Sequence, residues 1–559
     1  MDFVLMLHSH LPWVLHHGRW PHGSDWLCEA ALDTYLPLIE QLRRLAHEGV
    51  PAPITLGITP VLANQLSHPD FPAEFAHLLN ERLAAAERAP TDLVVTGDGD
   101  LVPLAGYWRH RLHRLGRLLE DLGGDVVGEF GRLQRAGRLE LISSAATHGY
   151  LPLLGRDESI RLQLEVGVRE HERLFGRRPR GCWVPECAYR ARGPWAPPGA
   201  RAVAERPGVE EHLAAAGYEF FFADSHLAAA GQPLGAYPDV PLGAERFDAD
   251  RHDRTGSRVG DTRRSPYEAY VVSRPGHPAV HAFIRDPRSS MQVWSRHQGY
   301  PGDEWYLEFH KIRWPGGLKL WRVTGPEADL GTKRPYDVAA ARSRAEAHAG
   351  HFAGLLGTIA GEPDHTGSVI VAPFDTELFG HWWFEGVDFL ADVYRRLATT
   401  QGVRPVTGSH HVRARRRRPH IRLAEGSWGA QGDHSMWMND ETRWMWERLW
   451  PLEDAFWAAA HHAIRAPWAR PVLAAAARQL LLAQSSDWQF IISTGAAGDY
   501  AESRFRRHCD DAEALLRGLE PQAPEDGRAA AAALAAAVNA RDDLFPDVLD
   551  AVDAVLASP

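Results

Sequence analysis

Cysteine is scarce in this chain of 559 residues, which contains four. Cys182 and Cys187 are separated by four residues and do not form a CxxC motif, and Cys28 and Cys509 stand apart from both. So few unpatterned cysteines exclude a disulfide framework. We therefore expect free thiols and a reducing, cytoplasmic location.

We expect no targeting segment at the start of this sequence, and the chain has no excess of positive charge. Its start, MDFVLMLHSHLPW, has no basic region, and His8 and His10 interrupt its apolar run, so we expect neither a signal peptide nor a membrane span. Acidic residues outnumber basic ones by 72 to 61, which gives a net charge of −11. Nothing in this balance attracts nucleic acid or an anionic membrane, and we expect neither as a partner.

The overall composition is that of a globular protein of more than one domain. Hydrophobic residues make up 45% and charged residues 24% of a chain too long for a single compact core. Tryptophan (20) outnumbers tyrosine (13). Many tryptophans belong to cores, but sugar-binding grooves also use broad aromatic faces with polar rims.

Short apolar segments alternate with helical or loop segments over the first two thirds of the chain. Helical patterns are clear at 34–46 and 160–175. Strands that alternate with helices predict an α/β fold with a parallel sheet, and seven strands predict a closed or nearly closed barrel, with an eighth strand not excluded. The seven segments are 3–7, 54–59, 139–145, 182–186, 219–224, 280–286 and 368–375.

Each of the seven segments ends in a polar residue or is followed by one. A barrel gathers the carboxyl ends of its strands at one face, so these side chains should converge there. The alternative is that each is only a turn former, although seven such cases together weaken it. The residues are His8, His10, Thr59, His148, Glu186, Asp224, His226, Arg285, Asp286 and Asp375.

Two of the segments have the same order of residues, in which an acidic residue comes shortly after an apolar run and a proline. In RGCWVPECAY and SVIVAPFD, an apolar run meets a proline, and the acids Glu186 and Asp375 follow. Proline has no N–H for the strand ladder, so it favours the end of a strand. A pair of carboxylates suits retaining glycoside chemistry if the groups lie about 5–5.5 Å apart. Glu377 is a rival acid, because an extended chain would place it on the same side as Asp375.

The later part of the chain changes in character. The segment 227–266 is rich in Gly, Pro, Arg and Asp and contains the lone aromatic Tyr237, which is either a local anchor or the tip of a lid. The basic run 413–418 is typical of a solvated linker. Beyond about residue 424, Trp428 and Trp437 fall in loops, where we expect them to offer an open ring face, before a series of amphipathic helices.

Several motifs resemble those of glycoside hydrolase family 57, and more narrowly its 1,4-α-glucan branching enzymes. The resemblance runs from the first strand to about residue 510, and the Ala-rich tail carries no signature. The motifs are HSHLPW (8–13), ATHGYLPLL (146–154), WVPECAY (183–189), APFDTELFGHWWFEG (372–386), EGSWG (425–429) and SDWQF (486–490).

The resemblance implies a (β/α)7 barrel at 1–410, with an inserted helical subdomain and active-site loop around 187–266, and an all-α domain at 420–559. It also implies a retaining mechanism without metal or cofactor, with Glu186 as nucleophile and Asp375 as general acid/base. His148 joins the expected sugar-binding groups because it follows a strand. The full substrate-binding set is His10, His148, Tyr237, Arg285, Trp294, Gly302, Trp428, Trp437 and Asp487.

The expected function is that of a branching enzyme of glycogen metabolism. It would cleave an α-1,4 glucan and transfer the chain to a 6-hydroxyl through a covalent glucosyl–Glu186 intermediate, with Tyr237 covering the acceptor side. The sequence leaves the oligomeric state open. A hydrolytic α-amylase or a 4-α-glucanotransferase of the same family is the main alternative.

Two further alternatives belong to other classes. His8-x-His10 and an Asp after the last strand resemble metal-dependent amidohydrolases. Against this, the fourth strand delivers Glu186 where a bridging lysine is expected, and the sixth lacks a suitable histidine. A non-catalytic glucan-binding protein is the other alternative, and the presence of both carboxylates argues against it.

Overall fold

The structure is a computed structural model that describes residues 1–198, 202–229, 264–273, 276–294, 299–325, 327–363, 368–414 and 418–558. Most of the segment predicted to carry a lid, including Tyr237, lies outside these residues. The predictions for Tyr237 therefore have no structural account.

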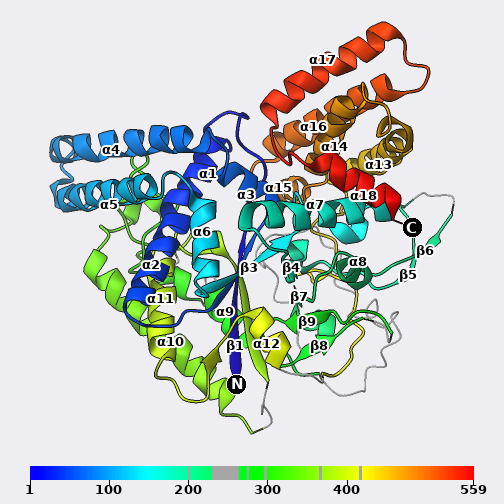
Figure 1. Cartoon of the computed structure of the whole chain (residues 1–559). Coiled ribbons are helices and arrows are strands. Elements are labelled where there is room, and N and C mark those ends of the chain that lie inside the picture. Colours follow the sequence, from blue (N-terminus) through cyan, green and yellow to red (C-terminus); the bar gives the residue numbers. More distant parts are fainter. Residues whose placement is uncertain are drawn as a thin grey trace.

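A parallel sheet that curves into a nearly closed barrel forms the centre of the molecule (Figure 1). Its neighbouring strands run parallel in the order β10-β1-β2-β3-β4-β7-β9. The Asp286 N–H donates to the Val371 carbonyl at 2.8 Å and so links the end of β9 to β10 across the seam. The strands are β1 (Asp2–Ser9), β2 (Ile54–Ile58), β3 (Leu139–Ser144), β4 (Gly181–Trp183), β7 (Phe220–Ala223), β9 (His281–Ile284) and β10 (Val369–Asp375).

All seven predicted strands are present, and the prediction of a barrel is confirmed. Two further strands of this sheet escaped the sequence pattern because they are short: β8 (Ala269–Val271) pairs antiparallel with β9, and β11 (Arg404–Pro405) lies beside β1. Every residue of β1, β2 and β3 is buried. Continuous apolar runs of this kind are expected where helices cover the sheet.

The predicted helices are also present. The pattern at 34–46 becomes a π-helical turn, Ala31–Tyr35, that continues into α2 (Leu36–His47). The pattern at 160–175 becomes α7 (Asp157–Phe175), which ends at Gly176 with φ of 73°. A glycine adopts this left-handed conformation without the steric cost that a Cβ would bring, so it ends the helix cleanly.

A pair of long helices projects from the barrel between β2 and β3. These helices, α4 (Phe71–Val95) and α5 (Val102–Asp121), pack against each other at the left of Figure 1. Within 187–266, the described residues hold the hairpin of β5 (Gly193–Trp195) and β6 (Ala204–Arg206), then α8 (Val209–Ala215) and β7. The predicted insertion at 187–266 therefore also contains β7, which is a strand of the barrel.

Helices make up the C-terminal part of the chain and gather beyond the carboxyl ends of the barrel strands (Figure 1). No helix in the described part of the chain is long and apolar enough to cross a membrane. The C-terminal helices are α13 (Arg443–Ala463), α14 (Arg470–Ala483), α15 (Asp487–Thr494), α16 (Gly498–Leu519), α17 (Glu525–Arg541) and α18 (Val548–Ala557).

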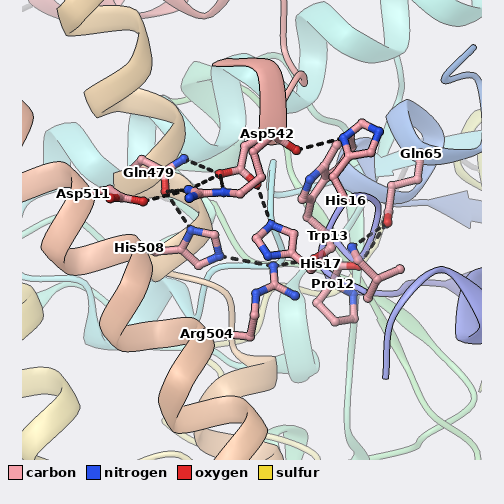
Figure 2. A network of polar contacts seen from close by, with 12 residues as sticks. Pro12, Trp13, His16, His17, Gln65, Gln479, Arg504, His508, Asp511 and Asp542 are labelled. Atoms are coloured by element: carbon pink, nitrogen blue, oxygen red, sulfur yellow. Dashed lines mark hydrogen bonds and ion pairs between the residues drawn. The ribbon is translucent and has the colours of Figure 1, made fainter. Parts of the chain in front are cut away.

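A buried polar network joins these helices to the segment that follows β1 (Figure 2). The fully buried Asp542 carboxylate accepts hydrogen bonds from His17 Nε2 at 2.7 Å and from Gln479 Nε2 at 2.9 Å. Arg504 on α16 donates to the Trp13 carbonyl at 2.6 Å. The network thereby connects the segment after β1 to α14, to α16 and to the end of α17.

We predict that Asp542→Ala loosens this junction. The substitution leaves the buried donors of His17 and Gln479 without an acceptor, and breaking such a buried charged network costs about 3–5 kcal/mol. Chemical unfolding of the variant should show a loss of this order, while Asp550→Asn, on the exposed face of α18, should leave the free energy of unfolding unchanged. Equal stability of the two variants would contradict the role given to Asp542.

Candidate active site

Glu186 lies in a strained turn just beyond β4. The strand ends at Trp183, and a 3₁₀ turn covers Pro185–Cys187. The predicted strand segment 182–186 is therefore too long at its end, because the ladder stops before Pro185, as the proline indicated, and Glu186 lies beyond the strand. Its φ of 61° is in the left-handed region, which costs energy for a residue with a Cβ and is characteristic of functional sites. The Trp428 N–H holds the turn by donating to the Glu186 carbonyl at 2.9 Å.

Two donors from the last third of the chain hold the Glu186 carboxylate. The indole Nε1 of Trp428 donates to Oε2 at 2.8 Å, and Ser486 Oγ donates to Oε1 at 2.9 Å. Ser486 in turn lies 2.9 Å from Nδ1 of the buried His148. Hydrogen bonds to a carboxylate favour its ionised form, so this arrangement supports a charged Glu186.

Asp375 ends β10 and pairs in register with His8 on β1. The prediction that the proline ends this strand is wrong, because β10 continues through Pro373, which pairs with Met6. Burial raises the pKa of Asp375 well above its ordinary value, the charge of Glu377 adds to this, and Arg285 opposes both. None of the described residues donates a hydrogen bond to its carboxyl group. Asp375 is therefore set to keep its proton near neutral pH.

The two carboxyl groups influence each other. Burial raises the pKa of Glu186 to about 7, the hydrogen bonds from Trp428 and Ser486 lower it, and the charge of Asp375 raises it again. Since two neighbouring carboxylates resist simultaneous ionisation, one proton is shared unequally. Glu186 has donors that stabilise its charge and Asp375 has none within the described part of the chain, so the charge falls on Glu186 and the proton on Asp375.

Glu377, the rival acid, supports the site from a different position. The chain does not stay extended after Asp375, because a 3₁₀ turn covers Thr376–Leu378. The Glu377 Oε1 accepts hydrogen bonds from the Tyr35 hydroxyl and, at 3.2 Å, from the His10 N–H. Burial raises the pKa of Glu377 to about 7. The Glu377 carboxylate is thus already bound by the Tyr35 hydroxyl and the His10 N–H.

Three histidines stack beside the acids. The rings of His8 and His148 lie 4.9 Å apart, those of His10 and His148 lie 4.1 Å apart, and His8 also stacks on Trp183 at 4.7 Å. Burial lowers the pKa of His8 and of His148 well below the ordinary value, so both are neutral. Neutral imidazoles that line a site suit sugar hydroxyls, which donate and accept hydrogen bonds.

One group of donor atoms in the site has metal-like spacing. Ligand atoms of His10, His148 and Asp487 lie within 4.8 Å of one another. However, His10 Nε2 already donates to Asp487 Oδ2 at 2.8 Å, and His148 is engaged by Ser486. His8 is not in this group, so the paired His8-x-His10 ligands expected of an amidohydrolase are not formed.

Arg285 and Asp224 form a fully buried ion pair behind the acids, with Nη1 and Oδ2 3.0 Å apart. Burial raises the pKa of Asp224, but the charge of Arg285 and the His226 ring outweigh it, and the net pKa lies below the ordinary value. The Arg285 guanidinium lies 5.7 Å from the ring centroids of both Trp294 and Trp428. The positive charge of Arg285 therefore lies close to the rings of Trp294 and Trp428.

The aromatic residues differ from the prediction. Trp428 is 3% exposed and Trp437 is 1% exposed, so neither offers an open ring face. Trp437 stacks on Tyr150 at 4.6 Å, because the loop folds its ring inward. Trp428 instead presents its N–H to Glu186. The half-buried Trp294, edge-on to Trp428 at 5.6 Å, is the ring better placed for substrate.

Gly302 falls in the 3₁₀ turn Tyr300–Gly302. Tyr300 fixes this turn by stacking on His348 at 4.5 Å and by bonding to His351. None of the contacts made by the described residues connects Gly302 to the acids. Its predicted role toward substrate stays a prediction.

Sequence reasoning missed two residues that touch the carboxylates. Ser486 precedes the predicted Asp487 in SDWQF, so the motif contained a signal for it. Tyr35 lies in the predicted helical stretch 34–46, and nothing local marks its hydroxyl as the partner of Glu377, 342 residues away.

The site geometry agrees with comparisons with known proteins. Residues 4–423 match the model for glycosyl hydrolase family 57, and residues 452–552 match that for the C-terminal part of 1,4-alpha-glucan branching enzymes. The 1,4-alpha-glucan branching enzyme TK1436 of Thermococcus kodakarensis is 39% identical over 92% of this chain and 73% of its own length.

Solved structures give the same result. The crystal structure of TK1436 matches with a TM-score of 0.87 at 37% identity, covering 99% of this chain and 96% of the other. The alpha-amylase AmyC from Thermotoga maritima matches with a TM-score of 0.79 at 28% identity, covering 99% and 98%. On the family match over most of its length and on these relatives, the chain belongs to glycosyl hydrolase family 57.

Proposed function

We propose that this protein is a 1,4-α-glucan branching enzyme with Glu186 as nucleophile and Asp375 as general acid/base. The observation that carries the proposal is the pair of hydrogen bonds from Trp428 and Ser486 to the Glu186 carboxylate, whereas Asp375 has no such donor among the residues that the structure describes. Ser486 comes from the part of the chain that matches the branching-enzyme C-terminal model. Relatives named as branching enzymes support the same reaction.

In the first step, ionised Glu186 attacks the anomeric carbon of an α-1,4-linked glucosyl unit. Asp375 gives its proton to the departing glycosidic oxygen, and a glucosyl ester forms on Glu186. In the second step, the Asp375 carboxylate takes the proton of an acceptor 6-hydroxyl, which attacks the anomeric carbon and releases Glu186. Two inversions retain the α configuration, and the product carries an α-1,6 branch.

Each remaining group has a part in this scheme. His10 and the neutral ring of His148 bind sugar hydroxyls, and Asp487 fixes His10 through its contact at 2.8 Å. The buried Arg285 stabilises negative charge near the pair and holds Trp294 in place for stacking. We also propose, from the sequence, that Tyr237 covers the acceptor side, that Gly302 lines the groove, and that Trp437 acts by supporting Tyr150.

Hydrolysis is the second candidate, because the similarity to an alpha-amylase extends over the whole chain. The two reactions differ in whether water or a sugar hydroxyl reaches the covalent intermediate first. Higher identity to branching enzymes and the match at 452–552 favour transfer.

The proposal also covers the division of the chain into two units and the location of the enzyme. Residues 1–410 form the catalytic unit and 420–559 a helical unit that closes the groove. The four cysteines are free and buried in the structure, which agrees with a cytoplasmic enzyme acting on glycogen-type α-glucan.

Product analysis on amylose tests the reaction. We predict α-1,6 linkages, released as short chains by a debranching enzyme, with few new reducing ends. Reducing ends that accumulate without 1,6 linkages would establish an α-amylase instead.

Substitution of the acids tests their roles. Glu186→Gln should abolish turnover and leave glucan binding intact, because the shape and one acceptor oxygen remain. Asp375→Asn should lower kcat by about 10²–10⁴-fold, the usual contribution of general acid catalysis. Glu425→Gln, which changes a more exposed carboxylate, serves as the control. Unchanged turnover in Glu186→Gln would refute the nucleophile assignment.

The pH profile tests the protonation states. The reactive form has ionised Glu186 and protonated Asp375, so kcat/KM should rise with pH through about 7, as Glu186 loses its proton, and fall when Asp375 loses its own. Ser486→Ala removes a hydrogen bond that lowers the pKa of Glu186, and the acid limb should therefore move to higher pH. An acid limb that stays in place would contradict this role of Ser486.

The other limb responds to Glu377. Glu377→Gln keeps an oxygen for the Tyr35 hydroxyl but removes a charge that raises the pKa of Asp375. The alkaline limb should therefore move to lower pH. A shift in the opposite direction for Glu377→Gln would show that its charge does not act on Asp375.

A further inference from the structure

A cavity of about 330 Å³ lies where α2, α5 and α11 (Gly386–Leu397) meet, at the left of Figure 1. None of the described residues that line it belongs to the active site, and the mechanism gives it no role. Pockets that bind small ligands have volumes of about 300–1,000 Å³, so the cavity is large enough for a ligand of its own.

Two aromatic residues form the apolar part of the lining. Tyr107 comes from α5, and Phe384 from the segment that joins β10 to α11. Both side chains are half-buried, so part of each remains accessible. The buried Trp108 lies 5.2 Å from Phe384, measured between ring centroids, and holds that ring from the protein side. Fixed aromatic surface of this kind suits the C–H groups of a sugar ring.

Arg111 and Tyr107 supply hydrogen-bond donors that none of the described residues uses. The Arg111 guanidinium lies 4.6 Å from the centroid of the Phe384 ring, and it makes no hydrogen bond or ion pair with the described part of the chain. The Tyr107 hydroxyl also has no hydrogen-bond partner there. The contact with Phe384 holds the guanidinium at the cavity, where its N–H groups remain available to a ligand.

Glu40 and Asp388 supply acceptors, because each has one oxygen bound and the other available. Arg114 donates to Glu40 Oε2, and Gln41 Nε2 donates to Asp388 Oδ1 at 2.7 Å. Glu40 Oε1 accepts no hydrogen bond from the residues that the structure describes, and Asp388 Oδ2 lies 3.6 Å from Arg342 Nη1, which is too far for a hydrogen bond. The two side chains are 30% and 46% exposed, so a ligand can reach both.

This combination of groups favours a neutral ligand that is rich in hydroxyls. A hydroxyl donates and accepts, so it can bind the carboxylates and the guanidinium alike. An anion would gain from Arg111 but would be repelled by Glu40 and Asp388, which line the same cavity. We propose that the cavity is a second binding site for α-glucan, in which one or two glucosyl units pack against Tyr107 and Phe384. The choice of α-glucan among carbohydrates rests on the proposed function.

A second site holds the polymer while the active site works on one of its chains. When two sites contact the same polymer, the second contact is intramolecular and raises the effective concentration of glucan at the first. The cavity therefore strengthens the binding of long glucans. It contributes to KM rather than to kcat, because its residues do not touch the reacting atoms.

Binding of glycogen to the full chain, measured as retardation in native gels that contain it, tests the site without turnover if all proteins carry Glu186→Gln. Arg111→Ala and Asp388→Asn should each raise the apparent Kd about tenfold, the effect of losing one hydrogen bond to a charged group. Asp388→Asn is nearly isosteric, so it separates loss of an acceptor from loss of the fold. Arg117→Ala, which changes an exposed arginine of α5 outside the cavity, should leave the Kd unchanged. Equal retardation of all these proteins would overturn the proposal, and so would release of the glycogen by inorganic phosphate, which would indicate an anion site.

Kinetics of proteins that keep Glu186 separate this proposal from the proposed function. Arg111→Ala should raise the apparent KM for amylose by about the same factor and leave kcat unchanged. A lower kcat with an unchanged KM would overturn the second site. If the unsubstituted enzyme forms reducing ends and no 1,6 linkages, the proposed function fails, but weaker retardation of Arg111→Ala would still support glucan binding in the cavity.

Discussion

The hydrogen bonds that reach Glu186 from the far end of the chain are the constraint on which the rest of the site depends. A carboxylate buried beyond a strand end would stay protonated, and burial alone raises its pKa. Trp428 and Ser486 oppose that tendency by donating to both oxygens. Asp375 has no such donor in the described ranges of the chain, so the same burial keeps its proton in place. Two acids thus acquire opposite roles from their surroundings.

This division ties the catalytic centre to the whole fold. The barrel delivers the acids, but Ser486, at the start of α15, donates to Glu186, and the next residue, Asp487, holds His10. Trp488, the next residue, lies under the Arg504 guanidinium at 5.1 Å, and Arg504 in turn binds the Trp13 carbonyl. The C-terminal helices are therefore part of the active site rather than an appendage, and the network around Asp542 keeps them in place.

The sequence predicted what local patterns determine. Seven apolar runs became seven strands, and both acids lie at or just beyond a strand end, although the proline ends the ladder only before Glu186 and β10 continues through Pro373. It did not predict what depends on contacts between distant parts of the chain. Ser486 reaches Glu186 across 300 residues, and Trp437 was wrongly expected to be open because only the folded chain brings Tyr150 against its ring. The turn at Glu186 was missed because its left-handed backbone is sustained by tertiary contacts rather than by a glycine.

The most direct test of the account is the covalent intermediate itself. A fluorinated glucosyl fluoride that forms the ester faster than it is released should label the protein once, and peptide mapping by mass spectrometry should place the sugar on Glu186. The account predicts this label, and predicts its loss in Glu186→Gln. A label on Asp375 or Glu377, or turnover without any covalent adduct, would contradict the assignment of the charged and the neutral acid.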